Sequence, residues 1–195
     1  ILHKWYMEPF LLMYCLINKN MNSKQKADFA SAYENNKEKV WALISKYVQT
    51  QQEKEDLFQD IFLKVYKSLP YFRNESKLET WIYRIAVNTS INFAKKKKRL
   101  NMLNEALKII RLTDNHPPEE NLDRDNNNIL LWKPMEKLNP QQKMILLLAE
   151  VEEKPLNEIA EYLKIPLGTV KSNLFRAKQI IKKEIEKGGT KNVNL

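Results

Sequence analysis

The sequence predicts an all-α fold of two small helical domains joined by a flexible acidic linker, with a helix-turn-helix as the C-terminal domain. Only 3 of the 195 residues are glycine, and few glycines among many Lys, Glu, Leu and Ile favour helix. Apolar residues recur at helical rather than alternating spacing on both sides of residues 101–128. Within that stretch, Pro117 and Pro118 stand among asparagines and acidic residues, a composition typical of a linker.

Residues 1–20 differ in character from the rest of the chain. Their apolar run, Phe10 to Ile17, is far shorter than the roughly 20 residues that a membrane-spanning helix needs. No small-residue cleavage site of a signal peptide follows it. We therefore expect 1–20 to be a non-native or disordered extension, with the protein proper beginning at Met21. The alternative is an arm that touches a membrane or binds a partner.

Residues 21–100 carry three helical patterns and are expected to form the first domain. The first begins near Lys24, and the second has a broad apolar stripe that Pro70 ends. Ser76 and Glu79 have the spacing of a capping box, which predicts that the third helix begins near Lys77. This helix runs into a block of like charge, residues 95–99.

Residues 129–187 are expected to form the second domain, followed by a tail at 188–195. Asn139 precedes Pro140 as an N-cap precedes a first-turn proline. In "PLNEIAEYLKIPLGTVKSNLFRAKQII" two short apolar faces flank a turn, which is the pattern of a helix-turn-helix. We expect Thr169 to cap the second of these helices and Gly168 to permit a tight backbone turn.

The polar residues of this second helix point to a negatively charged partner. In a helix-turn-helix the first turns of the second helix reach base edges, and later residues suit phosphates. The candidate DNA-binding residues are Thr169, Lys171, Ser172, Asn173, Arg176 and Lys178. The alternative is a plain helical hairpin with a solvated basic face.

The overall composition supports a binding protein rather than an enzyme. A net charge of +9 favours nucleic acid or an acidic membrane surface as partner, although a merely lysine-rich soluble protein has the same charge. The one cysteine, Cys15, excludes an internal disulfide and agrees with a cytoplasmic location. No catalytic motif or zinc spacing is present, so we expect no enzymatic activity, no metal and no cofactor.

Two stretches resemble one protein family. "LNPQQKMILLLAEVEEKPLNEIAEYLKIPLGTVKSNLFRAKQIIKK" resembles the C-terminal promoter-binding domain of extracytoplasmic-function (ECF) sigma factors. "EDLFQDIFLKVYKSLPYFRNESKLETWIYRIAVNTSINFAKKKKR" resembles their N-terminal domain. The resemblance implies a subunit that binds core RNA polymerase and directs promoter-specific transcription initiation. Residues 21–100 would be sigma region 2, which melts the minus-ten element. Residues 129–187 would be sigma region 4, which reads the minus-thirty-five element as duplex.

The resemblance also implies roles for residues of region 2. The helix that matches the polymerase-binding helix of the family would dock on the β′ coiled coil, and the β flap is the other expected polymerase contact. The expected exposed residues of this docking helix are Asp56, Gln59, Asp60 and Lys64. A pocket for an extruded base would be formed by Phe72, Arg73, Asn74, Ser76 and Lys77. The DNA backbone would follow Arg84, Asn88, Asn92, Lys95 and Lys96. Trp81 could stack on a base, but its place on the apolar stripe favours the core.

Three features depart from the family, and a fourth leaves alternatives open. Asn92 stands where the family often has an acidic residue, and Lys95 to Lys98 stand where arginines are common. Asn173 stands where many members carry Arg, and since Asn favours adenine and Arg favours guanine, we expect a shifted base preference. The acidic linker could occupy a polymerase channel built for nucleic acid, or could be a soluble spacer.

Two other functions compete with the sigma-factor hypothesis. A helix-turn-helix transcription regulator could act without being a polymerase subunit, but it would usually need a sensor domain. An adaptor whose basic helix binds an acidic protein would lack promoter-specific, salt-sensitive binding. An anti-sigma factor is a possible further partner, and no small-molecule substrate is expected.

Overall fold

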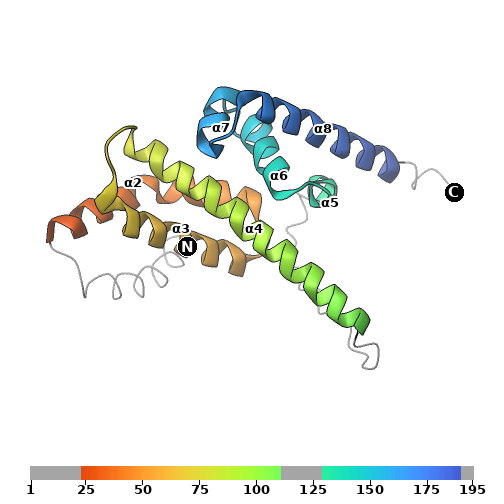
Figure 1. Ribbon diagram of the computed structural model, residues 1–195, viewed down its shortest axis with the longest axis horizontal. Helices are drawn as coiled ribbons and strands as arrows, with labels where there is room; N and C mark the ends of the chain where they lie inside the picture. The colour runs from red at the N-terminus through yellow and green to blue at the C-terminus, as the bar shows by residue number, and fades with distance from the viewer. Residues whose placement is uncertain (1–22, 111–128, 190–195) are drawn as a thin grey trace. The chain divides into compact units, whose positions relative to one another are not determined.

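Figure 1 shows the computed structural model, which describes residues 23–110 and 129–189. Every element in these two ranges is helical, as the sequence predicts. The chain divides into two compact units, and the boundary after Ser90 falls inside the long helix Leu78–Ile110. That whole helix is described with the first unit, and the second unit is described from residue 129. Residues 1–20 and most of the predicted linker lie outside the described residues. Within the described ranges, no helix combines the length and apolarity that crossing a membrane requires.

The first unit begins with two helices and a tight turn. Helix α2 spans Ser23–Tyr47, α3 spans Gln51–Ser68, and a single 3-10 turn, η1, spans Leu69–Tyr71. Thr50 caps α3, because its hydroxyl accepts a hydrogen bond from the Glu53 amide at 3.3 Å. Pro70 lies within η1, so the α-helix ends just before the predicted proline.

An aromatic cluster forms the core of this unit. Tyr33 of α2 packs edge-on against Phe58 and Phe62 of α3, with ring centroids 6.1 and 4.8 Å apart. Phe29 makes a similar contact with Tyr66 at 5.6 Å. Such edge-to-face pairs add to the free energy gained from burying the rings. Tyr47 is also buried here, and burial raises the pKa of its hydroxyl, which therefore stays neutral.

Helix α4 (Leu78–Ile110) supplies the third wall of the first core. Its residues Ile82, Ala86 and Val87 are fully buried. At its polar edges, Lys39 of α2 pairs with Glu79 at 3.1 Å, and the Lys64 ammonium of α3 lies 3.4 Å from the Thr89 hydroxyl. The helix begins one residue after the predicted start at Lys77.

Helix α4 also extends further than the sequence analysis placed it. The linker was expected to begin at residue 101, whereas the helix continues to Ile110. Residues 101–110 contain neither proline nor glycine, and Leu, Met, Glu, Ala and Lys are good helix formers. A charge block therefore does not end a helix when the residues after it still favour one. The structure does not describe residues 111–128.

The second unit consists of α5 (Ile129–Glu136), α6 (Pro140–Leu146), a π-helical turn η2 (Leu147–Val151), α7 (Leu156–Leu163) and α8 (Leu167–Gly189). Asn139 forms a full capping box with Gln142, at 2.9 and 3.1 Å, and Pro140 occupies the first turn, as predicted. The helix that begins at Pro140 changes to π-helix at Leu147.

The helix-turn-helix consists of α7 and α8, and its predicted faces pack together. Ile159, Val170 and Ala177 are fully buried, while Leu174 is half-buried. The turn is closed by hydrogen bonds from the Ile165 amide to Ala160 O and from the Thr169 amide to Pro166 O, at 3.1 and 2.9 Å. These contacts fix the direction in which α8 leaves the turn.

Two details of the predicted turn are wrong. Helix α8 begins at Leu167, so Thr169 lies inside the helix and does not cap it. Gly168 does not have a positive φ angle. The left-handed residue is Lys164, at φ 53° and ψ 46°, where its amide bonds the last carbonyls of α7. The physical reason is that the chain reverses at the end of α7, which is where a left-handed C-cap is needed.

Candidate nucleic-acid interface

Helix α8 presents a polar face opposite its buried seam. Lys171, Ser172 and Arg176 are exposed, while Thr169 and Asn173 are half-buried beside the seam. Around Gly168 the space is open, since a Cβ built there would meet no atom within 4 Å. The first two turns of this helix are therefore accessible from outside the protein, as docking into a groove of duplex DNA requires.

The Thr169 carbonyl holds two of the predicted DNA-binding side chains. The Ser172 hydroxyl donates to it at 3.1 Å, and the Asn173 Nδ2 donates to it at 2.8 Å. One amide hydrogen of Asn173 is therefore engaged within the helix. The Oδ1 atom and the second amide hydrogen remain for an external contact.

Phe175 belongs to the same outward face and was missed by the sequence analysis. Its side chain is 65% exposed, one turn after Lys171 and Ser172. Phe is one of the residues that contact the methyl group of thymine in the major groove. The available signal was an aromatic residue on the polar side of an amphipathic helix, which burial in the core does not explain.

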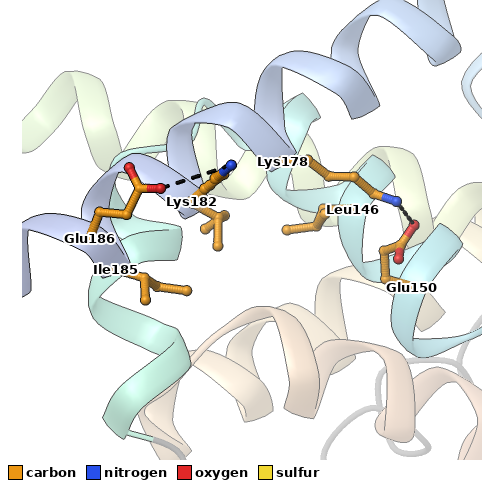
Figure 2. A pocket seen from close by; sticks show the side chains of 7 residues that line it. Leu146, Glu150, Lys178, Lys182, Ile185 and Glu186 are labelled. Carbon is orange, nitrogen blue, oxygen red and sulfur yellow. Dashed lines mark ion pairs between the residues drawn. The ribbon is translucent and has the colours of Figure 1, made fainter. Parts of the chain in front are cut away.

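Lys178 lies elsewhere than the other predicted residues of α8. Its ammonium pairs with Glu150 of η2 at 2.8 Å, and both side chains are about half exposed. The pair forms part of the rim of an open groove between α6, η2 and the C-terminal half of α8 (Figure 2). The structure thus places Lys178 beside a different surface from that of Lys171 and Ser172.

This groove has an apolar floor and a charged rim. Leu146, Ile181 and Ile185 line it, and Figure 2 shows the ion pairs Lys178–Glu150 and Lys182–Glu186 around them. Its volume is about 590 Å³. Ile185 is 52% exposed although it is aliphatic. The groove therefore combines an apolar floor with a rim that carries both signs of charge.

In the first unit, the loop between α3 and α4 carries a pair of aromatic rings. Phe72 and Trp81 have ring centroids 5.0 Å apart at 42°. Both are half-buried, so the expectation that Trp81 belongs to the core is wrong. Trp81 stands in the first turn of α4, where the helix meets the loop, and its ring packs against Phe72 of that loop.

The polar residues of the loop surround this pair. Arg73, Asn74 and Lys77 are exposed and Ser76 is half-buried. Asn74 has a positive φ of 56°, which turns the chain sharply at the loop tip. Arg73 lies 4.0 Å from Glu75, but both side chains are more than three quarters exposed, so this ion pair is weak.

A polar stripe continues from the loop along α4. Arg84 and Asn88 are half-buried, and Asn92, Lys95 and Lys96 are exposed. Arg84, Asn88, Asn92 and Lys96 recur every four residues, and Lys95 lies three residues after Asn92, so all five lie along one side of the helix. The Asn88 amide donates to the Arg84 carbonyl at 2.8 Å, which holds it along the helix axis. The stripe offers cations to a partner that extends along α4.

The exposed face of α3 carries the four residues predicted to bind polymerase. Asp56, Gln59 and Lys64 are exposed and Asp60 is half-exposed. Asp60 pairs with Lys64 at 2.8 Å, so these two residues form one neutralised unit. Leu63, on the same helix, is 38% exposed. The face therefore combines acid, amide and apolar groups.

Each helical unit presents a surface of basic, polar and aromatic side chains: the loop and the stripe of α4 in the first unit, and the polar face of α8 in the second. These features are typical of modular helical proteins that bind nucleic acid. Residues 32–100 match the family described as Sigma-70 region 2, and residues 130–181 match Sigma-70 region 4. Both matches are in the order that the sequence analysis proposed.

Proteins of similar sequence belong to the same family. The chain is 32% identical over 164 residues to the ECF RNA polymerase sigma-E factor of Haemophilus influenzae, covering 80% of this chain and 85% of that protein. It is 31% identical over 156 residues to the RNA polymerase sigma-H factor of Pseudomonas aeruginosa, covering 76% and 81%. The chain belongs to the ECF RNA polymerase sigma factors, which bind the polymerase and direct transcription initiation.

Solved structures show the same fold. CnrH, in complex with the cytosolic domain of CnrY, matches with a TM-score of 0.54 at 14% identity, covering 90% of this chain and 96% of that chain. The sigma factor RpoE of Bartonella quintana, in complex with the anti-sigma factor NepR, matches with a TM-score of 0.51 at 17% identity, covering 82% and 97%.

Proposed function

We propose that the two units of this sigma factor recognise one promoter in two different forms. The first unit captures the minus-ten element as single strand and thereby melts it, and the second unit reads the minus-thirty-five element as duplex. The observation that carries this division is the difference between the two surfaces. The loop of the first unit offers half-buried aromatic rings, which suit unstacked bases, whereas α8 offers a polar helix face.

In the first unit, the captured base would enter beside Phe72 and Trp81. Unstacking a base costs a few kcal/mol, so the protein must supply substitute stacking and hydrogen bonds. Arg73, Asn74, Ser76 and Lys77 surround the ring pair and supply polar groups. The adjoining strand would follow Arg84, Asn88, Asn92, Lys95 and Lys96 along α4, because phosphates are neutralised by cations on one face.

In the second unit, Lys171, Ser172 and Asn173 would reach base edges and Arg176 would bind a phosphate. Phe175 joins them through its exposed ring, and Thr169 acts indirectly by holding Ser172 and Asn173. Lys178 is removed from this set, because its ammonium is paired with Glu150. This assignment predicts that base specificity comes from the first two turns of α8.

The polymerase would be bound at two places. We assign the β′ coiled coil to the face of α3 with Asp56, Gln59, Asp60 and Lys64, where acids and an amide suit a basic helix. We assign the β flap to the groove of Leu146, Ile181 and Ile185, where an apolar helix face could lie between the two ion pairs. An anti-sigma factor is proposed as a regulatory partner. The chain would act in the cytoplasm, with the polymerase, and would direct its catalysis without contributing catalytic groups.

Run-off transcription tests this function. Core polymerase is incubated with a promoter library, with and without the full chain, and the transcripts are sequenced. We expect a defined subset of promoters to be transcribed only when the chain is present. The variant Asp56→Lys should lose association with core polymerase and transcription while retaining binding to the minus-thirty-five duplex. A wild-type chain that does not associate with core polymerase would overturn the proposal.

A further inference from the structure

The side chain of Tyr71 is exposed beside the loop of the first unit, and no role has been assigned to it above. It is 81% exposed, the largest exposed fraction among the exposed large hydrophobic side chains of the described residues. Isolated exposed apolar residues are ordinary. This one requires an explanation because of where it is held and what surrounds it.

The backbone of Tyr71 is fixed by local structure. It is the last residue of η1, in which Pro70 restricts the backbone, and the next amide, that of Phe72, donates to the Leu69 carbonyl at 3.1 Å. The turn follows α3 directly, since the Leu69 amide still bonds the Val65 carbonyl. Because the backbone is already ordered, only the two side-chain torsions of Tyr71 remain to be fixed when the ring binds a partner.

The neighbours of Tyr71 favour single-stranded nucleic acid as that partner. Phe72, the next residue, packs against Trp81, and the exposed cations Arg73 and Lys77 follow in the same loop. Aromatic rings beside cations are the combination by which proteins bind unpaired strands, with bases stacked on rings and phosphates near cations. Glu75 lies in the same loop but is paired only weakly, with Arg73.

We propose that Tyr71 is a stacking platform for a second unpaired base, next to the base captured beside Phe72 and Trp81. The inference rests on the proposed function, since it needs the minus-ten strand to be open. Stacking accepts any base, because every base has a π face. Tyr71 therefore contributes affinity for the open strand without adding sequence preference, and it stabilises the melted state at a position that base-specific contacts do not read.

The test uses the full chain bound to core polymerase and single-stranded oligonucleotides that carry the minus-ten sequence. A 2-aminopurine is placed at each position in turn, and its fluorescence reports stacking while a titration gives affinity. Tyr71→Ala should weaken binding about five- to one-hundred-fold. It should also restore the fluorescence of the base beside the captured one. Tyr71→Phe and Tyr71→Trp should bind within about twofold of wild type, because they keep a ring.

Two further variants make the outcomes distinguishable. Val151→Ala removes an exposed apolar side chain from the second unit and should change nothing. Phe72→Ala should weaken strand binding through the proposed pocket.

If Tyr71→Ala binds like wild type while Phe72→Ala does not, the inference is wrong and the proposed function stands. If Tyr71→Ala weakens association with polymerase but not with DNA, the ring is a protein contact and the inference is also wrong. If wild type binds no single strand, the proposed function fails as well.

Discussion

At the scale of single residues, hydrogen bonds within α8 decide which atoms remain for DNA. Asn173 illustrates this, because residue type alone suggests a contact that uses both its amide nitrogen and its oxygen with adenine. The structure engages Nδ2 with the Thr169 carbonyl at 2.8 Å. We still expect a preference for adenine, but the hydrogen bond from Nδ2 to the base must compete with the hydrogen bond that Nδ2 already makes in the free protein.

We therefore expect Asn173 to favour adenine over guanine by about 1 kcal/mol, the low end of what a good bidentate contact provides. The measurement is duplex binding with all four bases placed in turn at each position of the minus-thirty-five element. Asn173→Arg should shift the preference to guanine at the same position, since Arg pairs with guanine O6 and N7. A wild-type protein that prefers guanine there would contradict the prediction.

Arg176 and Lys178 lie two residues apart on α8 and provide a matched pair. Arg176 is exposed, whereas the ammonium of Lys178 is 2.8 Å from Glu150. Arg176→Ala should lower the slope of log affinity against log salt by about 1, because each neutralised phosphate contributes about 0.9. Lys178→Ala should change this slope less. Equal changes for the two variants would show that Lys178 leaves Glu150 to bind DNA.

At the scale of secondary structure, capping and turn residues decide where each helix begins and ends. Asn139, Pro140 and Gln142 form the start of α6 by purely local rules, so their sequence predicts their structure. The turn of the helix-turn-helix is different. There Lys164, not Gly168, has the left-handed backbone conformation, because the amides of Lys164 and Ile165 turn back to bond the last carbonyls of α7.

Replacement of Lys164 tests this assignment. A residue with a Cβ loses roughly 1 kcal/mol in the left-handed conformation, and glycine does not. Lys164→Gly should therefore raise the stability of the second unit by up to about 1 kcal/mol. Lys164→Ala keeps the Cβ and is the control. Hydrogen exchange of the Ile165 and Val170 amides measures the local free energy of opening. Slower exchange in the alanine variant than in the glycine variant would contradict the assignment.

At the scale of the whole molecule, the proposed DNA-binding face and the apolar groove are two separate surfaces of the second unit. Ser172 and Ile181 are nine residues apart in α8, which is about 13 Å along a helix axis. The proposed DNA contacts lie in the first turns of α8, and the apolar groove lies beside its later turns. One helix can therefore bind duplex and polymerase at the same time, as a factor that places polymerase on a promoter must.

The separation of these surfaces predicts separable defects. Ile185→Glu places a charge on the half-exposed floor of the groove without disturbing a buried residue. It should lower transcription from promoters that depend on the minus-thirty-five element, because contact with polymerase would bury an unpaired carboxylate. Binding of the free protein to that duplex should stay within about twofold of wild type. Val151→Glu, at another exposed apolar side chain, is the control. Loss of duplex binding in Ile185→Glu would show that the surfaces are not independent.

Much of this protein could be predicted from its sequence because the signals are local. Helical spacing, proline positions and the Asn139 cap predicted the helices, and two motifs in one order predicted the family. Burial was harder to predict at helix ends. Trp81 has helical spacing on an apolar stripe, yet it stands in the first turn of α4 and is only half-buried. Tyr71 and Phe175 were overlooked because aromatic residues are usually buried, and only the structure shows them exposed.

The sequence by itself determined the helical class, the division into two units, the family and the polar face of α8. Each of these follows from the order and spacing of neighbouring residues. Only the tertiary structure decided that Lys178 pairs with Glu150, that Leu146, Ile181 and Ile185 form a groove, and that Trp81 meets Phe72. The physical reason is that these contacts join residues from different elements. Their geometry depends on how helices pack, which the spacing of residues along one helix does not specify.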